Sequence, residues 1–352
     1  MKPLEINENV PLADLTTFKV GGPARYLAQV ENEDNLLKAI SFAKSANLPT
    51  LALGSGSNVL ISDAGFNGLA IMNRIQGIEF SATNDSALVS AGAGVDWDYL
   101  VNFCTEKNWQ GIECLSGIPG TVGAAPVQNI GAYGQSAEEV ITGVRAIDST
   151  NSASAEFNKE HCGFGYRKSI FNTEASGHYV ITRVSFSLAV NRKPYAEHRD
   201  IINFLKNTQN PSLHAVRDAV LSIRKAKGLV ISNDSDSFMS AGSFFKNPLV
   251  ENSLFMKIKE DIEKNGGCEN WAWPQSDGSM KISAACIIQT AGFGKGYIYG
   301  KAGISPKHSL CIINRGGATA SELAAFAELI QKEVWARFTI RLEPEVRFIG
   351  FR

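Results

Sequence analysis

Residues 51–60 read Leu51-Ala-Leu-Gly54-Ser55-Gly56-Ser57-Asn58-Val59-Leu60, a glycine- and serine-rich turn that directly follows a predicted buried strand. Glycines let a backbone approach a ligand closely, and successive N–H groups with serine hydroxyls can surround a phosphate. A dinucleotide site of Rossmann type does not fit, because Val59 replaces the third glycine and a β-branched segment follows instead of a helix. A P-loop does not fit either, since the turn has no lysine. The residues alone leave a phosphate-binding loop of another kind and an ordinary tight turn as equal readings.

The segments around this turn predict strands and helices that alternate. Before it, the periodicity of apolar residues predicts a small βαβ unit, with a strand at 25–30, a helix at 34–46 and a strand at 50–53. After it come a strand at 87–91, a helix beginning at Asp96 whose Trp97, Leu100, Val101 and Cys104 share one face, and a strand at 179–188.

A long loop lies between these elements. Residues 111–134 are rich in glycine and poor in charge, and the part from Leu115 to Gly134 has five glycines, two prolines and no charged residue. A loop of this length in free solvent is normally polar. Its small and apolar side chains indicate close packing against a large flat ligand or another domain, and a ligand role is favoured over a buried structural loop.

The second half of the chain gives clearer helix signals than strand signals. The polar stretch 191–210 indicates a connection or an insertion, a helix is predicted over 213–227, and residues 231–241 read as a flexible, turn-rich entry to the last part. The capping box Thr319-Ala-Ser-Glu322 predicts the start of a long helix. Residues 340–348 alternate as in a strand, with Glu343 and Glu345 on the same polar face, so parity does not separate these two carboxylates.

Composition narrows the possible partners. The 352 residues favour two or three domains, and 34 Lys and Arg against 35 Asp and Glu give a net charge of −1, which argues against a nucleic-acid binder. No apolar run is long enough to cross a membrane, and residues 1–15 do not resemble a secretory signal, so we expect a cytoplasmic protein. The five histidines form no metal-binding spacing. Six widely spaced cysteines predict free, buried thiols.

Five segments, in order along the chain, carry a resemblance to a known family. The Gly54–Leu60 turn and the Ser116–Gly134 loop closely resemble the FAD-binding segments of the UDP-N-acetylenolpyruvoylglucosamine reductases, bacterial enzymes of peptidoglycan-precursor synthesis. Three later segments are also similar: Phe164-Gly-Tyr166-Arg167, Ala241-Gly-Ser243-Phe-Phe-Lys246-Asn247-Pro248 and Leu342-Glu-Pro-Glu345-Val-Arg-Phe-Ile-Gly350. The similarity extends from Thr17-Phe18-Lys19-Val20-Gly21-Gly22 to the C-terminus.

The resemblance implies an α+β flavoprotein of the vanillyl-alcohol-oxidase and p-cresol-methylhydroxylase type. We expect two FAD-binding subdomains at 1–70 and 71–228, the second with the insertion 191–210 of the family's longer form. A substrate-binding domain would follow at 229–352, its last residues packing back on the first subdomain. In this family NADPH reduces FAD and leaves, and the enolpyruvyl substrate then enters the same cleft. Hydride goes to the vinyl carbon, and protonation of the enol(ate) gives UDP-N-acetylmuramate. The expected protein is a monomer that acts on small molecules.

The resemblance also assigns roles to single residues. Ser243 corresponds to the proton donor, Arg167 to the residue that binds the substrate carboxylate and stabilises the enolate, and Glu345 to the carboxylate that polarises the enol system. Read without the family, these residues would be a turn or helix cap, a surface ion pair and a charge ladder on a sheet. A serine hydroxyl is a weak acid, so Ser243 needs a neighbouring cation or relay, which Lys246 could supply. The predicted FAD contacts are Gly54, Ser55, Gly56, Ser57, Asn58, Val59, Ile118, Pro119, Thr121, Ala124 and Gly131. The predicted substrate contacts are Tyr133, Tyr195, Lys227, Lys246 and Asn247.

The chain departs from the family pattern after the helix at 213–227. Longer-form enzymes usually have Lys-Leu-Pro-Asp-Pro here, whereas Lys227 is followed by Gly-Leu-Val-Ile-Ser-Asn-Asp-Ser-Asp-Ser. Because these prolines are missing, the resemblance does not fix the role of Lys227 or the geometry of the 228–240 linker. Two other functions are also considered, a flavin oxidase of the same fold that acts on another substrate with oxygen, and a non-catalytic protein that binds nucleotide sugars.

Overall fold

The structure is a computed structural model that describes residues 3–231 and 239–351, so part of the 228–240 linker lies outside the described residues. It divides into two compact units. The first unit consists of Met1–Pro11, Pro23–Gly56 and Phe66–Ser232, and the second of Leu12–Gly22, Ser57–Gly65 and Asn233–Arg352. The boundary between the units therefore passes through the Gly54–Val59 turn.

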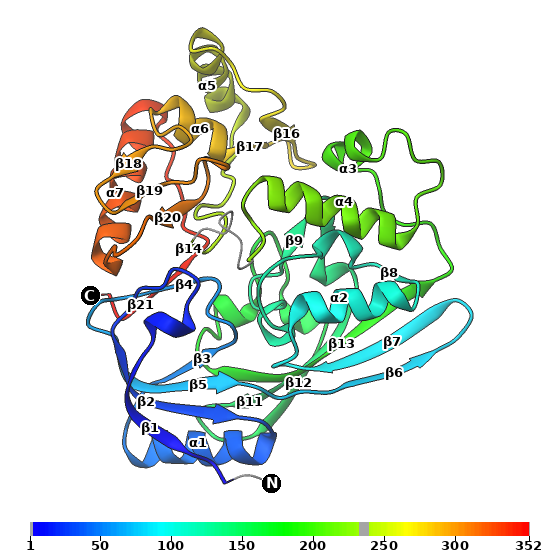
Figure 1. Cartoon of the computed structure of the whole chain (residues 1–352), viewed down its shortest axis with the longest axis vertical. Helices are drawn as coiled ribbons and strands as arrows, with labels where there is room; N and C mark the ends of the chain where they lie inside the picture. The colour runs from blue at the N-terminus through cyan, green and yellow to red at the C-terminus, as the bar shows by residue number, and fades with distance from the viewer. Residues whose placement is uncertain (1–2, 232–238, 352) are drawn as a thin grey trace. The chain divides into compact units, whose positions relative to one another are not determined.

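The first unit begins with a four-stranded sheet that carries the predicted βαβ unit. Its strands run in the order β1-β2-β5-β3, with β1 (Ile6–Pro11) antiparallel to β2 (Pro23–Val30), and with β5 (Phe66–Asn73) parallel to both β2 and β3 (Thr50–Leu53). Helix α1 (Glu33–Ser45) starts at Asn32, whose side chain accepts a hydrogen bond from the Asn35 N–H. Its apolar face is buried under the sheet, as Figure 1 shows. The three elements predicted between residues 25 and 53 are confirmed.

A larger sheet forms the rest of this unit's core. Its strand order is β12-β11-β13-β7-β6, and the short β8 pairs with one end of β13. The bounds are β6 Ile78–Ala82, β7 Ser86–Gly92, β8 Trp109–Gln110, β11 Ile141–Asp148, β12 Ser154–Asn158 and β13 Tyr179–Val190. Helix α2 (Trp97–Glu106) covers one face of this sheet and buries the four predicted residues of its apolar face (Figure 1). Its predicted start is confirmed, since the Asp96 side chain accepts a hydrogen bond from the Tyr99 N–H.

The predicted long loop at 111–134 is more ordered than expected. It contains the 3-10 turns η2 (Glu113–Leu115) and η3 (Val122–Ala124), and it ends in a hairpin of β9 (Gly131–Ala132) and β10 (Gln135–Ser136). Further 3-10 turns follow at η4 (Ala137–Glu139), η5 (Glu160–Cys162) and η6 (Ile170–Asn172). The polar stretch 191–210 contains a short helix, α3 (Arg199–Phe204), which packs against α4 (Leu213–Ala226), the helix predicted over 213–227.

The second unit has two small antiparallel sheets and a strand pair of its own. The first sheet has the order β14-β20-β19-β18, the second has the order β15-β17-β16, and β4 pairs with β21 in parallel. The strand bounds are β4 Val59–Ile61, β14 Met239–Ser240, β15 Leu249–Val250, β16 Ala272–Pro274, β17 Met280–Ile282, β18 Ile298–Tyr299, β19 Ala302–Ile304, β20 Ile312–Asn314 and β21 Arg347–Ile349. The helices are α5 Asn252–Lys264, α6 Ala284–Thr290 and α7 Ala320–Phe338, with the 3-10 turn η1 at Ala13–Leu15. The capping box at Thr319 and Glu322 is present, as predicted.

The prediction of one continuous strand over residues 340–348 is wrong. Only Arg347–Ile349 form strand β21, and the chain bends at Glu345 and Val346 after a single bridge between Pro344 and Phe245. Proline has no N–H to donate to a sheet ladder, which explains why pairing stops there. After the bend, the predicted alternation of buried and exposed side chains no longer holds. Phe348, which it places on the apolar face, is exposed, and Ile349 is buried.

The prediction of free thiols is wrong for two of the six cysteines. Cys268 and Cys286 form a disulfide that joins the segment after α5 to the first turn of α6. Eighteen residues separate them, and the β16–β17 hairpin lies between. Sequence spacing could not show that this hairpin brings the two side chains together. Cys104, Cys114, Cys162 and Cys311 are free and buried, as predicted.

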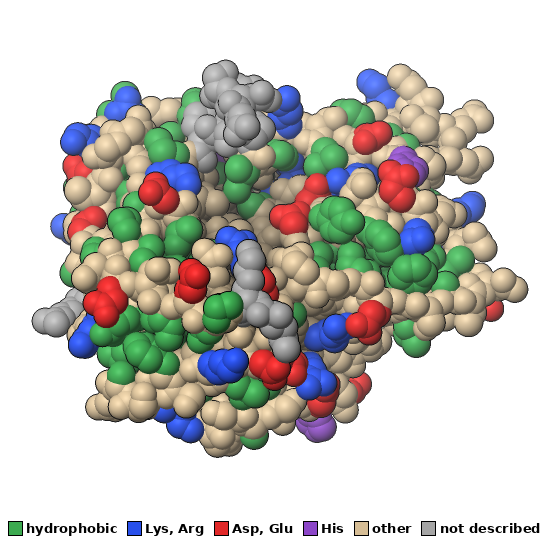
Figure 2. Space-filling view, turned by 60° about the horizontal axis from the view of Figure 1, so that its bottom comes forward, with side chains coloured by type: hydrophobic (Ala, Val, Ile, Leu, Met, Phe, Trp, Pro, Cys, Tyr) green, Lys and Arg blue, Asp and Glu red, His purple; other side chains and the backbone are tan. Residues whose placement is uncertain are grey.

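Charge is spread over the surface. Figure 2 shows acidic and basic side chains interspersed on the face it draws, in keeping with the net charge of −1. Within residues 3–231 and 239–351, no helix is both long and apolar enough to cross a membrane.

The N-terminus of α7 has an unusual charged partner. The Asp63 carboxylate accepts hydrogen bonds from the N–H groups of Ala320 (2.8 Å) and Ser321 (2.9 Å) and from the Ser321 hydroxyl (2.6 Å). Partial burial raises the pKa of Asp63, but these hydrogen bonds outweigh it and leave the pKa below its ordinary value. A carboxylate at this end of a helix also interacts favourably with the helix dipole.

We expect Asp63→Asn to lower the free energy of unfolding by about 1 kcal/mol at pH 7, because the cap loses its charge. A depressed pKa stabilises the folded protein above the unfolded pKa of about 3.9, and this contribution is lost as pH falls through the lower folded value. Urea unfolding of both proteins at pH 7 and pH 3 checks this. A difference that is the same at both pH values would show that the charge contributes nothing.

Candidate active site

In the first unit, the two predicted FAD-binding loops lie side by side. A Cβ atom placed on Gly54 would lie 2.6 Å from the Thr121 hydroxyl oxygen, and one on Gly123 would lie 2.6 Å from the Ala93 Cβ. A larger residue at Gly54 would push the two loops apart, and one at Gly123 would push the second loop away from Ala93. The N–H groups of Val122 and Gly123 donate to the carbonyls of Val95 and Ala93, which holds the second loop against the turn that follows β7.

These loops offer groups that fit a flavin dinucleotide. The Ser55 hydroxyl is buried and has no hydrogen-bond partner in the described part of the chain. A buried hydroxyl normally has a partner, so a phosphate or flavin oxygen would satisfy it. Ile118 and Pro119 are partly exposed and Ala124 is exposed, so the apolar loop keeps a surface that the core does not use. Ser57, Asn58 and Val59 belong to the second unit, where the Asn58 side chain donates to the Glu345 carbonyl (3.0 Å).

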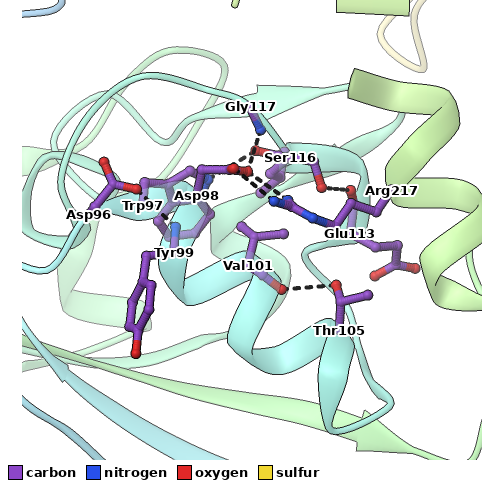
Figure 3. Close-up of polar contacts among 11 residues, drawn as sticks. Asp96, Trp97, Asp98, Tyr99, Val101, Thr105, Glu113, Ser116, Gly117 and Arg217 are labelled. Carbon is purple, nitrogen blue, oxygen red and sulfur yellow. Dashed lines mark hydrogen bonds and ion pairs between the residues drawn. The ribbon is translucent and has the colours of Figure 1, made fainter. Parts of the chain in front are cut away.

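The start of helix α2 holds the second loop along its length (Figure 3). The Trp97 N–H donates to the Gly120 carbonyl (3.1 Å), and its indole N–H donates to the Leu115 carbonyl (3.0 Å). Asp98 accepts a hydrogen bond from the Gly117 N–H (2.6 Å) and forms a two-pronged ion pair with Arg217 of α4 (2.6 and 2.8 Å). The loop is thus fixed at Leu115, Gly117 and Gly120, on both sides of the partly exposed Ile118 and Pro119.

Arg167 lies at the corner of a tight turn closed by two hydrogen bonds between Gly165 and Lys168. Its backbone has the left-handed φ of 53°, and its guanidinium Nη2 donates to the Gly131 carbonyl (2.8 Å). The Asn129 side chain donates to the Gly165 carbonyl (3.0 Å), which ties the same turn to the loop. The structure therefore brings Arg167 and Gly131 together.

Three predicted substrate contacts also meet in the first unit. Tyr133 and Gly134 form the two-residue turn of the β9–β10 hairpin, with φ values of 50° and 89°. The Tyr195 hydroxyl lies so close to Gly134 that a Cβ atom there would be 2.4 Å from it. The Lys227 ammonium lies 5.4 Å from the centre of the Tyr133 ring and pairs with Asp200 of α3 (2.7 Å). Burial raises the pKa of Tyr133 to about 12, so its hydroxyl stays protonated at neutral pH.

The structure shows how helix α4 ends at Lys227, where the chain lacks the prolines of the family pattern. Gly228 adopts a φ of 66°, and the N–H groups of Gly228 and Leu229 donate to the carbonyls of Lys225 and Arg224. A left-handed glycine ends the helix, which the prolines do in the usual family pattern.

The second unit holds the other predicted residues. Phe244 and Phe245 are buried and anchor the segment that carries Ser243, whose hydroxyl makes no hydrogen bond within residues 3–231 and 239–351. The Glu345 N–H donates to the Phe244 carbonyl (2.8 Å), so the two segments run next to each other. Lys246 pairs instead with Glu343 (3.3 Å), and the Asn247 side chain accepts a hydrogen bond from the Ala284 N–H at the start of α6 (3.0 Å).

Sequence reasoning missed the residues that support these groups. Asp98, Arg217 and Asp200 make ion pairs with distant partners, and the buried Glu113 accepts hydrogen bonds from the N–H groups of Gly111 and Tyr195. The residues next to each of them in the sequence do not distinguish it from any other charged residue of a helix or loop. The only sequence signal was the position of Arg217 on the same helix as Lys227.

Comparison with known proteins identifies the family to which the chain belongs. Residues 24–153 match the FAD binding domain family, and residues 234–349 match the UDP-N-acetylenolpyruvoylglucosamine reductase C-terminal domain. The chain is 39% identical over 349 residues to the UDP-N-acetylenolpyruvoylglucosamine reductase of Thermobifida fusca, which covers 97% of each chain. The chain belongs to the UDP-N-acetylenolpyruvoylglucosamine reductase family.

Other members of the reductase family support the same assignment. The enzyme of Cutibacterium acnes is 39% identical over 351 residues, covering 97% of this chain and 90% of that protein. The crystal structure of the reductase from Thermus caldophilus matches 99% of this chain and all of that chain, with a TM-score of 0.66 and 25% identity. The predicted fold, an FAD-binding domain of vanillyl-alcohol-oxidase type with the reductase C-terminal domain, is confirmed. So are the predicted FAD-dependent oxidoreductase class, UDP-N-acetylmuramate dehydrogenase, and the use of FAD with NADPH.

Proposed function

We propose that this protein reduces UDP-N-acetylglucosamine enolpyruvate to UDP-N-acetylmuramate in the cytoplasm, as a monomer of the family's longer form. Family membership over nearly the whole chain is the observation that carries the proposal. Bound FAD supplies, after reduction by NADPH, the hydride that the vinyl carbon of the substrate receives. The residues of the chain bind the substrate, stabilise the developing negative charge and deliver the proton.

Arg167 is proposed to bind the substrate carboxylate. A guanidinium presents a planar fork of N–H donors that matches a carboxylate and the enolate oxygen. One of its nitrogens is held by the Gly131 carbonyl, which orients the group beside the predicted flavin loop. Charge on this carboxylate side of the substrate grows as the hydride arrives, so a fixed cation favours that step.

Ser243 is proposed to give the proton to the carbanion centre. The Ser243 hydroxyl makes no hydrogen bond to another of the described residues, so its proton is not committed within that part of the chain. Of the two candidate carboxylates, Glu343 pairs with Lys246. We therefore propose that Glu345 polarises the enol system.

The residues proposed to hold the substrate are Tyr133, Tyr195, Lys227, Lys246 and Asn247. Tyr195 and α3 lie in the 191–210 segment, which supports its assignment as the insertion of the longer form. The Lys227 ammonium pairs with Asp200 at 2.7 Å, and an anionic diphosphate would have to take the place of this carboxylate as its partner. We also propose that the chain has two FAD-binding subdomains, 1–70 and 71–228, and a substrate-binding domain, 229–352.

The visible spectrum of the purified protein tests the proposal. We expect a flavin spectrum that bleaches with anaerobic NADPH and recovers on addition of the enolpyruvyl substrate. Fast recovery in air without that substrate would favour the oxidase. A protein that stays colourless after incubation with FAD and binds UDP-sugar would favour the non-catalytic binding protein.

The two candidate carboxylates can be separated by matched substitutions. We expect Glu345→Gln to lower kcat by about 100-fold or more, since the amide cannot carry the charge that polarises the enol system. Glu343→Gln should change kcat by about twofold at most, because the Glu343 side chain is largely exposed and pairs only weakly with Lys246. Steady-state kinetics of both variants check this. A larger loss in Glu343→Gln would reverse the assignment.

A further inference from the structure

We propose that Asp98 and Arg217 are positioning residues that hold the FAD-binding loop in register with helix α4, and through α4 set the position of Lys227. The part concerning Lys227 rests on the proposed function. Neither residue touches the reacting atoms in this proposal. Figure 3 shows the Arg217 side chain of α4 pointing toward Asp98 of α2, whose carboxylate also accepts the Gly117 N–H.

The first observation is that one carboxylate serves two partners. Asp98 Oδ1 accepts hydrogen bonds from both the Gly117 N–H (2.6 Å) and Arg217 Nη1 (2.6 Å), while Oδ2 accepts from Nη2 (2.8 Å). The Arg217 side chain is 10% exposed and the Asp98 side chain 33%, so the pair is partly buried and water screens it less than a fully exposed pair. Burial raises the pKa of Asp98, but Arg217 and the Gly117 N–H outweigh it and lower the pKa overall, so the carboxylate stays charged.

The second observation is that the loop presses directly on α4. Gly117 has a φ of 70°, and a Cβ atom there would lie 2.8 Å from Leu221 Cδ2 and 3.5 Å from Arg224 Nε. Gly117 thus lies against the stretch of α4 from Leu221 to Arg224, while Arg217, one turn earlier on the helix, reaches the loop only through Asp98. Lys227 caps the end of the same helix.

These contacts couple the two sites. The next residues of the loop, Ile118 and Pro119, are predicted FAD contacts, and the Trp97 hydrogen bonds fix the loop on either side of Gly117. If the fork between Asp98 and Arg217 is lost, the loop and α4 are free to shift against each other. Such a shift would change the FAD contacts and the position of the Lys227 ammonium together.

The substitution that tests the proposal is Asp98→Asn. Asparagine keeps an oxygen for the Gly117 N–H, but it cannot form the charged two-pronged pair with Arg217. We expect the dissociation constant of FAD, measured by fluorescence titration of the apoprotein, to rise about tenfold. In the reconstituted enzyme, the KM for the enolpyruvyl substrate should rise more than kcat falls.

A matched control breaks a different ion pair of the same unit. Arg145 pairs with Glu33 at 2.8 Å, on α1 and away from the FAD loops, so Glu33→Gln should leave FAD affinity within about twofold of wild type. Arg217→Lys keeps the charge but loses the fork, and an FAD affinity between those of wild type and Asp98→Asn is expected. This variant also serves if Asp98→Asn does not fold.

The proposal is overturned if Asp98→Asn loses thermal stability but binds FAD as tightly as wild type, or if Glu33→Gln weakens FAD binding equally. Failure of the proposed function looks different. Wild-type protein would then bind FAD but not turn over the enolpyruvyl substrate, and the comparison of FAD affinities would still stand.

Discussion

Replacing Ser243 with alanine is expected to leave flavin reduction by NADPH within about twofold of wild type and to slow reoxidation by the enolpyruvyl substrate by about 10²–10⁴-fold. The two half-reactions separate because only the second requires a proton at carbon. Alanine removes a hydroxyl that makes no hydrogen bond to the described residues, so the substitution leaves no other group unpaired. Anaerobic stopped-flow measurement of the flavin absorbance follows both steps.

A serine outside the proposed machinery provides the comparison for Ser243. Ser253→Ala, in helix α5 of the same unit, should leave both half-reactions unchanged. Equal losses of both half-reactions in Ser243→Ala would contradict the role as proton donor, since they would indicate general damage to flavin binding.

Arg167→Lys is expected to reduce kcat/KM for the enolpyruvyl substrate by about 10²–10³-fold. Lysine keeps a positive charge but offers no planar fork, so it cannot hold the Gly131 carbonyl and the substrate carboxylate in the same geometry. The loss should appear in both KM and kcat, because a carboxylate contact acts in the ground state and enolate stabilisation acts in the transition state. The rate of flavin reduction by NADPH should stay close to that of wild type.

Arg183→Lys is the matched control for Arg167. Arg183 lies on β13 and its ion-pair partner at 3.1 Å, Glu79, is 75% exposed, so this pair contributes little, and lysine keeps its charge. Steady-state kinetics should show kcat/KM within about twofold of wild type. A comparable value in Arg167→Lys would remove Arg167 from the proposed chemistry.

The sequence predicted best what depends on neighbouring residues. The starts of α2 and α7 follow from Asp96 and from the Thr319–Glu322 box, because a cap and its N–H partner lie within three residues. The loop rich in glycine could also be predicted from neighbouring residues, because close packing of its backbone requires small side chains at those positions.

What the sequence could not predict depends on partners far along the chain. Asp98 and Arg217 lie 119 residues apart, and nothing near either residue indicates that one carboxylate serves both Arg217 and Gly117. The Cys268–Cys286 disulfide is similar, because only the folded β16–β17 hairpin brings the thiols together. The wrong prediction of a continuous strand over residues 340–348 has a local cause. Pro344 interrupts strand pairing although the residues around it alternate between polar and apolar.

The division of the second unit among three chain segments has a consequence for synthesis on the ribosome. Strand β4 and Asp63 emerge early, but their partners in β21 and α7 are made only near the end of the chain. At about 5–20 residues per second, these early segments wait on the order of tens of seconds for their partners. The first unit has all its strands before then, so it can fold while the second unit still lacks its last strand. A fragment that begins at residue 233 would lack β4 and the Asp63 carboxylate that binds the N-terminus of α7, and it should therefore fold poorly by itself.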